Sequence, residues 1–152
     1  MKEEKGASTD KILLILASLF YNDSPIRGRT RFQKIVFLLK EKYGISFDFE
    51  FKPYYYGPYS EELSDTLSLL TALKFLEEHA EHFGMGMTRY DYRLTERGRR
   101  YFEAAQKDSK ENTQKIISKI RKDIAQVNTL PTPELVSNAK SLMKSRYERL
   151  QS

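Results

Sequence analysis

Two stretches of alternating apolar and polar residues constrain the fold of this chain more than any other feature. Successive side chains of a strand point to opposite faces, so this alternation is typical of a half-buried β-strand. The apolar members are Phe47, Phe49 and Phe51 within residues 45–55, and Tyr90, Tyr92 and Leu94 within residues 88–94. The two glycines of residues 84–87 predict a hairpin tip before the second strand, and Pro53 predicts a sheet edge or a strand end. We therefore expect a small antiparallel sheet.

The rest of the chain repeats apolar residues every three to four positions, which is the spacing of amphipathic helices. Six helices are expected, over residues of about 8–21, 30–43, 60–76, 95–106, 109–128 and 132–150. The predicted N-terminal signals are Ser8, Thr9 or Asp10 for the first helix, a Thr30/Gln33 capping box for the second, Ser60 for the third and Thr95 for the fourth. Residues 77–83 could extend the third helix or form a strand. The link at 128–131 is short enough to predict a helical hairpin.

The composition excludes several classes of protein. The 152 residues include no cysteine, which excludes disulfides, thiolate zinc sites, iron–sulfur clusters and a cysteine nucleophile. No apolar run approaches the ~20 residues that span a bilayer, and no apolar core of a signal peptide follows the charged N-terminus. We expect a soluble, cytoplasmic protein. Residues 8–106 would form one domain, and residues 107–152 a helical extension that packs on it or forms a dimer interface.

Charge is distributed unevenly along the chain, which has a net charge of +5. Residues 27–44 contain six basic and one acidic residues, whereas residues 45–82 contain two basic and eight acidic residues. Overall basicity favours nucleic acid as a partner, and this pattern indicates which segments could contact it.

Three segments resemble known families. Residues 92–102, YRLTERGRRYF, resemble the last wing strand and following helix of winged-helix proteins, which share the pattern Y-x-L-T-x-x-G. Residues 31–39, RFQKIVFLL, and 55–63, YYGPYSEEL, resemble segments of the YwgA-like proteins and, more distantly, of Panacea (SocA-type antitoxin) domains. The resemblance covers about residues 10–105. It implies an α+β, mostly helical fold with a winged helix-turn-helix core.

Basic residues that could contact DNA form two clusters, one at the start of the second helix and one around the last strand. They are Arg27, Arg29, Arg31, Lys34, Arg89, Arg93 and Arg97. If the clusters meet in space, they form a phosphate-binding surface. The third helix usually enters the major groove of DNA, but here Glu61, Glu62 and Asp65 would be repelled by phosphates. The alternative is that the arginines pair with the acidic segment 45–82 within the protein or across a dimer.

Tyrosines around the Y-G-P turn are the candidate contacts to a protein partner. They are Tyr54, Tyr55, Tyr56 and Tyr59. Tyrosine is favoured at interfaces because it buries a large ring and keeps a hydroxyl group for hydrogen bonding. The alternative is that these rings pack beneath the turn, as the three phenylalanines before them are expected to pack in the core.

Signals of catalysis and of bound cofactors are weak. His79 and His82 are the only histidines, and two ligands do not close a metal site. On a helix they would share a face, whereas on a strand they would point to opposite faces. The sequence contains no Ser-His-Asp pattern, no G-x-S-x-G motif and no glycine-rich phosphate loop. We expect a non-catalytic protein without metal or cofactor.

Fold resemblance and charge favour a DNA-binding transcriptional regulator that contacts phosphates through the start of the second helix and the wing. The acidic third helix favours the alternative, an interaction module of antitoxin or adaptor type. Dimerisation through the C-terminal helices would double the basic surface and is a further hypothesis.

Overall fold

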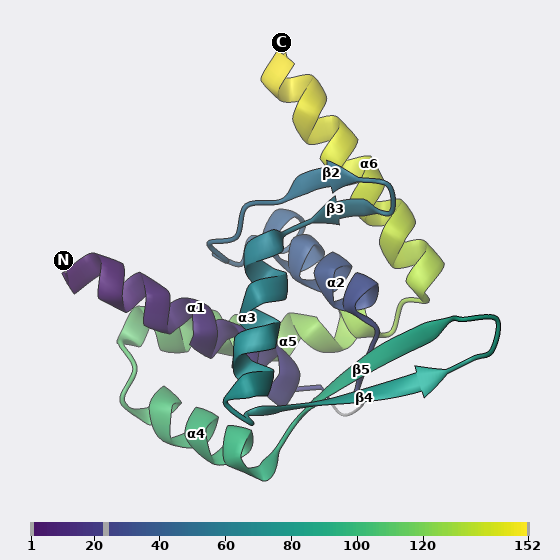
Figure 1. Ribbon diagram of the computed structural model, residues 1–152. Helices are drawn as coiled ribbons and strands as arrows, with labels where there is room; N and C mark the ends of the chain where they lie inside the picture. Colours follow the sequence, from purple (N-terminus) through teal and green to yellow (C-terminus); the bar gives the residue numbers. More distant parts are fainter. Residues whose placement is uncertain (1, 23–24, 152) are drawn as a thin grey trace.

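The computed structural model describes residues 2–22 and 25–151, and side chains for residues 11–22 and 25–150. Within these residues six helices and five short strands follow one another along the chain (Figure 1). The helices are α1 (Lys2–Phe20), α2 (Arg29–Glu41), α3 (Glu61–Ala72), α4 (Glu96–Lys107), α5 (Glu111–Asn128) and α6 (Thr132–Gln151). The strands are β1 (Ile26–Arg27), β2 (Lys52–Tyr54), β3 (Gly57–Tyr59), β4 (Leu76–His82) and β5 (Thr88–Leu94). The fold is α+β and mostly helical, as expected.

The larger sheet has three antiparallel strands in the order β1-β5-β4. β4 and β5 form a long hairpin, in register from Leu76 opposite Leu94 to His82 opposite Thr88. Residues 77–83 are therefore mainly strand rather than helix, and the tip at residues 84–87 lies where the glycines predict it. β1 was not expected from the sequence, because two residues are too few to show an alternation. It pairs with the middle of β5, with Ile26 opposite Tyr92.

The phenylalanine stretch forms only part of the strand that its alternation predicts. Phe47, Phe49 and Phe51 are buried and the residues between them are exposed, so the predicted faces are confirmed. Regular strand pairing nevertheless begins only at β2, which forms a two-stranded hairpin with β3, with Pro53 opposite Pro58. Before β2, the carbonyl of Phe49 accepts a hydrogen bond from the Lys40 amine at 2.6 Å. A side chain of α2, rather than a neighbouring strand, satisfies this backbone group.

Two predicted helix caps are confirmed and two are wrong. The hydroxyls of Ser60 and Thr95 accept hydrogen bonds from backbone N–H groups of α3 and α4. The Thr30/Gln33 capping box does not form, because the Gln33 amide donates to the Ser60 carbonyl and accepts from the Ser60 N–H, both at 2.9 Å. α1 begins at Lys2, so its start does not lie at Ser8, Thr9 or Asp10. The side chains of those three residues lie outside the described ones.

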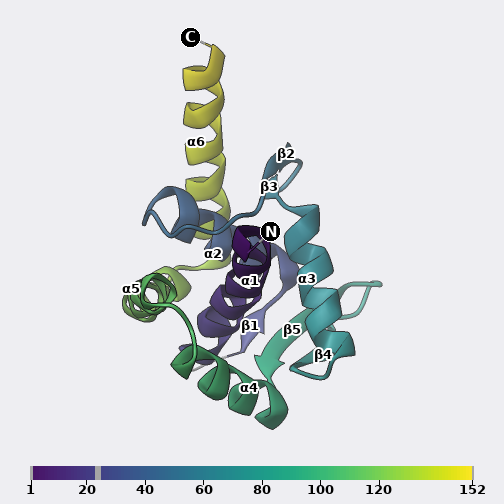
Figure 2. The same cartoon turned by 90° about the vertical axis from the view of Figure 1, so that its left-hand side faces the viewer.

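α2 is the central helix of the fold, and every residue from Phe32 to Leu39 is buried. α5 packs across α1 and α2, whereas α6 packs on α2 and β3. α5 and α6 run in clearly different directions (Figures 1 and 2), so the expected helical hairpin is wrong. Each of the two helices buries its apolar face on α2 or α1 rather than on the other, and α6 ends well away from the rest of the molecule. No helix in the described residues has the length and apolar character needed to cross a bilayer.

Candidate functional site

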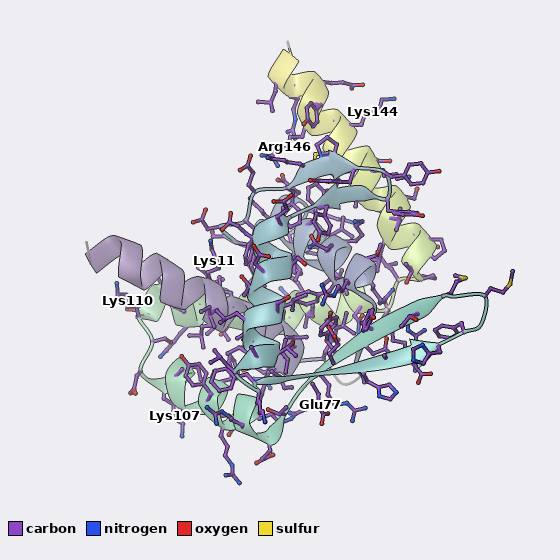
Figure 3. All side chains as sticks on the ribbon, in the orientation of Figure 1. Lys11, Glu77, Lys107, Lys110, Lys144 and Arg146 are labelled. Carbon is purple, nitrogen blue, oxygen red and sulfur yellow. The ribbon has the colours of Figure 1, made fainter. Side chains whose placement is uncertain are left out.

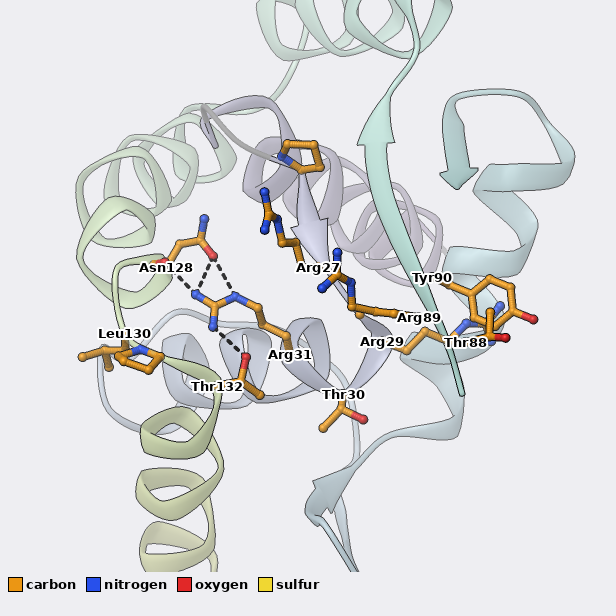
Figure 4. Close-up of a pocket in the computed structure, with 13 residues that line it drawn as sticks. Arg27, Arg29, Thr30, Arg31, Thr88, Arg89, Tyr90, Asn128, Leu130 and Thr132 are labelled. Atoms are coloured by element: carbon orange, nitrogen blue, oxygen red, sulfur yellow. Dashed lines mark hydrogen bonds between the residues drawn. The ribbon is translucent and has the colours of Figure 1, made fainter. Parts of the chain in front are cut away.

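A cavity of about 700 Å³ opens where β1 and α2, β5, and the link between α5 and α6 come together (Figure 4). Four arginines from the two basic clusters of the sequence line it: Arg27, Arg29, Arg31 and Arg89. The other lining residues that matter below are Thr30, Tyr90, Asn128, Leu130, Pro131 and Thr132. The two basic clusters, about sixty residues apart in sequence, thus meet around one hollow.

Strand pairing and one glycine bring the clusters together. Arg27 of β1 lies opposite Asp91 of β5, which places it beside Arg89. Gly28 then has φ of +103°, a backbone conformation that side chains disfavour, as the chain turns from β1 into α2. A Cβ atom at Gly28 would lie 3.5 Å from Arg89 Cγ, so the turn and β5 are in close contact.

Arg31 is held by neutral groups of the α5–α6 link. Its Nε and Nη2 donate to Asn128 Oδ1 at 3.2 and 3.0 Å, and Nη2 also donates to the Asn128 carbonyl at 2.6 Å. Its Nη1 donates to Thr132 Oγ1 at 3.1 Å. Burial lowers the pKa of Arg31, but a guanidinium stays protonated in proteins, and the helix dipole favours a cation at the end of α5. Arg31 is therefore a fixed positive charge, and no carboxylate of the described residues neutralises it.

Arg29 and Arg89, by contrast, are paired with acids. Arg29 Nη2 donates to Glu78 at 2.9 Å, its Nε donates to the Tyr92 hydroxyl, and that hydroxyl donates to Glu78 at 2.6 Å. Burial works to raise the pKa of Glu78, but the hydrogen bonds from Tyr92 and Arg29 outweigh it and lower the pKa. Arg89 makes a two-pronged bond to Asp91 at 2.7 and 2.9 Å, which raises the pKa of Arg89.

Arg27 completes the set as an exposed arginine that makes no hydrogen bond or ion pair with any residue the structure describes. Arg29 and Arg89 are thus paired with Glu78 and Asp91, and Arg89 also lies opposite Glu81 of β4, whose charge helps to raise the pKa of Arg89. None of the described residues that line the cavity is acidic, but Arg27 and Arg89 also line a second hollow that contains Glu77, Glu81 and Asp91. The alternative from the sequence, in which the arginines pair with the acidic segment 45–82, holds for the ion pair of Arg29 with Glu78. Asp91, which pairs with Arg89, lies outside that segment.

Lys34 is a correction to the sequence analysis, because it does not lie on the basic surface. It is 2% exposed, and its amine donates to the Pro58 carbonyl at 2.7 Å. A Cβ atom at Gly57 would lie 3.3 Å from the side chains of both Lys34 and Lys140, so α2, β3 and α6 are packed tightly here. Burial, and then the charge of Lys140, lower the pKa of Lys34 to about 8. Its role is to join elements of the fold.

The remaining two basic candidates lie outside the arginine-lined cavity. Arg93 lines a second hollow together with Glu77, Glu78 and Glu81 of β4, so its surroundings are of mixed charge. Arg97 belongs to α4, where its guanidinium lies 5.4 Å from the centre of the Phe75 ring. Neither residue adds to the cavity.

The four tyrosine candidates divide between an exposed and a packed pair. Tyr55 and Tyr56 form the β2–β3 turn, are 85% and 64% exposed, and pack edge to face with ring centres 4.9 Å apart. Tyr54 packs against Tyr59 in the same way at 5.2 Å, and its hydroxyl contacts Glu61 at 3.4 Å. The two rings at the tip of the hairpin are thus the most exposed of the four, and Tyr54 is half exposed.

The exposed side of α3 is acidic, as the sequence predicts. Glu61, Glu62 and Asp65 are exposed on this helix. Lys11 of α1 reaches toward α3 (Figure 3) and pairs with Glu62 at 2.8 Å. One pairing leaves most of the negative charge of this helix facing solvent.

The histidine pair lies on β4, where an odd spacing places His79 and His82 on opposite faces of the strand. No group of three or more residues that could hold a metal occurs among the described side chains.

Asn128, Thr132 and Tyr90 are site residues that sequence reasoning missed. Asn128 and Thr132 are about one hundred residues from Arg31 and belong to the segment interpreted as an extension. No spacing signal in the sequence connects them to the basic clusters. Tyr90 was expected in the core with Tyr92, but it is 41% exposed beside Arg29.

Comparisons with known proteins show a similarity to one protein that bears on the family of this chain. No protein-family model matches the chain. The chain is similar to the uncharacterized protein YwgA of Bacillus subtilis (strain 168), with 37% identity over 93 residues. The aligned part covers 61% of this chain and 55% of that protein, so the chain spans about half the length of this relative. The similarity supports the resemblance to the YwgA-like proteins, and the relative's name carries no activity.

Proposed function

We propose that this protein is a non-catalytic, DNA-binding transcriptional regulator that holds the phosphate backbone with Arg27, Arg29, Arg31 and Arg89. The observation that carries the proposal is that these four arginines line one cavity, and that none of its described lining residues is acidic. Contacts from arginine to phosphate give most of the affinity of proteins for DNA.

The proposal includes a winged-helix arrangement for the core. Two supports are the sheet order β1-β5-β4 and the position of the β4–β5 hairpin directly after α3. The Y-x-L-T-x-x-G segment, which suggested this arrangement, runs from Tyr92 in β5 to Gly98 in α4. In this arrangement the β4–β5 hairpin is the wing.

The proposed contact differs from the usual insertion of the third helix. α3 presents Glu61, Glu62 and Asp65 to solvent, and phosphates would repel these groups. The start of α2 favours anions instead, because it has no acidic residue in its first turn and no side chain caps it. DNA would therefore approach across β1, the start of α2 and the wing strand β5.

The test is a titration of duplex DNA, followed by fluorescence anisotropy at several salt concentrations. We expect binding that weakens steeply with salt, and a slope in Arg27→Ala that is smaller by about 0.9 per lost phosphate contact. Arg100→Ala is the matched control, since Arg100 lies on exposed α4 and pairs only with Glu96 one turn away. Absence of binding at ~50 mM salt, where electrostatic attraction is strong, would contradict the proposal.

A second candidate function is an adaptor that binds a protein through the β2–β3 turn. The exposure of Tyr55 and Tyr56 favours it, because large rings at a turn are typical of interface anchors. This candidate is supported if wild type and Tyr101→Ser both retain a protein that Tyr55→Ser/Tyr56→Ser does not retain. Equal retention by all three would contradict it.

A further inference from the structure

We propose that the outer edge of β4 pairs with β4 of a second copy of this chain, antiparallel and centred on Ala80, so that two three-stranded sheets join into one. The pairing is weak and forms at high protein concentration. It goes beyond the proposed function because it does not require DNA. It is also separate from any contact through α6, which lies elsewhere in the molecule (Figure 1).

The outer edge of β4 is open in the part of the chain that the structure describes. β4 is the last strand in the order β1-β5-β4, and its residues from Glu77 to His82 are all exposed. Beyond the start of β4, the β4–β5 hairpin extends away from the helices (Figure 1). An edge strand presents unpaired N–H and C=O groups, to which a further strand can bind.

The register of the hairpin shows which backbone groups point outward. The N–H of Phe83 donates to the carbonyl of Met87 at 3.0 Å, so these two residues form a hydrogen-bonded pair. Such pairs alternate along an antiparallel ladder, so the other odd-numbered residues of β4 also direct their backbone groups to β5. The backbone groups of the even-numbered residues around Ala80 therefore point outward, and no other described segment makes a hydrogen bond with them.

The side chains of β4 are self-complementary in the centred register. When Ala80 lies opposite Ala80 of the second copy, His79 lies opposite Glu81 and Glu78 lies opposite His82, each twice by two-fold symmetry. The positions of His79 and Glu81 form non-hydrogen-bonded pairs, in which opposed side chains approach most closely. An imidazole has at least one N–H for a carboxylate in either protonation state.

Charge also selects this register over its neighbours. Moving one strand by two residues keeps the outward backbone groups paired. In one direction the shift places Glu81 opposite Glu77 of the second copy, and in the other it places Glu81 opposite Glu81. Like charges directly opposite each other destabilise a strand pair. The charged residues of β4 thus prevent most pairings of this edge and permit the centred one.

Contacts within the chain leave these side chains able to pair. His79 Nε2 lies 3.4 Å from Glu81 Oε1 in the same strand, and the two side chains are 71% and 47% exposed. Glu78 is bonded to Arg29 and Tyr92, but a carboxylate has about four acceptor sites. The pairs of His79 with Glu81 therefore carry most of the specificity.

The test is analytical ultracentrifugation of the full-length chain with Tyr147→Glu/Leu150→Glu, which places charges on the exposed end of α6 and removes any contact there. We expect mainly monomer at about 10 µM and at least half of the chains in dimers at about 1 mM, since a small strand contact corresponds to a Kd of roughly 0.1–1 mM. All further variants carry these two substitutions.

Ala80→Pro tests the backbone pairing. Proline has no N–H and is tolerated at a strand edge where that N–H faces solvent, so pairing with β5 should persist. This variant should stay monomeric at the higher concentration. Ala80→Ser is the matched control, because it keeps the N–H and should dimerise. Circular dichroism melts would verify that each variant folds.

Charge changes test the register. His79→Lys/Glu81→Lys and His79→Glu should each be monomeric, because each places like charges opposite each other twice in its own dimer. An equimolar mixture of the two should recover the dimer, because every lysine then lies opposite a glutamate. Glu103→Lys, at an exposed position of α4, is the control for charge and should dimerise like the parent.

Three outcomes would overturn the proposal: a parent that stays monomeric at the higher concentration, a dimer that survives Ala80→Pro, or a mixture that stays monomeric. DNA binding is measured at low protein concentration, where this pairing is sparse. Failure of one proposal therefore leaves the other standing.

Discussion

At the scale of single residues, the environment of each cation decides what it can do. Arg31 and Lys34 lie three positions apart on α2, yet one lines the cavity and the other is buried beneath the β2–β3 hairpin. Arg31 keeps its charge through neutral acceptors, whereas Lys34 has one carbonyl partner and a lysine neighbour. Residue type alone therefore does not define the basic surface.

Lys34 leads to a prediction for the pH dependence of stability. The pKa of Lys34 is about 8 in the folded protein and 10.5 for an ordinary lysine, so the unfolded chain binds more protons between these values. The free energy of unfolding should rise with pH there, by about 2 kcal/mol between pH 8 and pH 10. Urea denaturation at several pH values measures it.

The matched variants for this prediction are Lys34→Met and Lys122→Met. Lys34→Met should lose the rise because it has no proton to bind, whereas Lys122→Met should keep it because Lys122 is exposed. Identical pH profiles for wild type and Lys34→Met would show that Lys34 does not titrate in this range.

At the scale of elements, close contacts between neighbouring segments determine how α4 sits beside the β4–β5 hairpin. Gly98 in α4 lies against the connection between α3 and β4, where a Cβ atom would be 2.2 Å from the Phe75 carbonyl oxygen. The carbonyl of Phe75 also accepts a hydrogen bond from the N–H of Thr95, the cap of α4. The glycine of the Y-x-L-T-x-x-G segment thus has a physical role in seating α4 beside the hairpin.

Gly98→Ala should destabilise the protein, although alanine is normally favoured over glycine in a helix. The methyl group would force the Phe75 backbone away, at a cost of about 1–3 kcal/mol typical of overpacking. Chemical denaturation measures the change. Ala104→Gly, at an exposed position of the same helix, should cost about 1 kcal/mol through propensity alone. A stabilised Gly98→Ala would contradict the close contact.

At the scale of the whole molecule, the C-terminal helices complete the site and leave one end uncovered. The α5–α6 link supplies Asn128 and Thr132 to Arg31, so the last third of the chain forms one wall of the cavity. The end of α6 extends away from the core, and Leu150 is 75% exposed. Dimerisation through this helix stays a prediction.

Light scattering at working concentration tests the dimer. We expect a dimeric mass for wild type and a monomeric mass for Tyr147→Glu/Leu150→Glu, because both side chains are exposed on the free end of α6. The DNA proposal does not depend on the result. A monomeric wild type would exclude the dimer.

The sequence by itself determined the features that depend on near neighbours. The burial of Phe47, Phe49 and Phe51, the caps at Ser60 and Thr95, and the tip at residues 84–87 follow from local spacing and local hydrogen bonds. The presence of six helices follows for the same reason, since an apolar stripe shows itself within a few turns.

Only the tertiary structure decided which distant groups meet. The arginine clusters converge because β1 pairs with β5, and β1 is too short to be predicted from the sequence. Arg31 donates hydrogen bonds to a neutral side chain because the fold places Asn128, which is ninety-seven residues further along the chain, beside it. The Gln33 side chain bonds to the backbone of Ser60 instead of capping α2. α5 and α6 separate because α5 packs on α1 and α2, whereas α6 packs on α2 and β3. These outcomes depend on long-range packing, in which buried polar groups take whichever partners the folded chain brings within hydrogen-bonding distance.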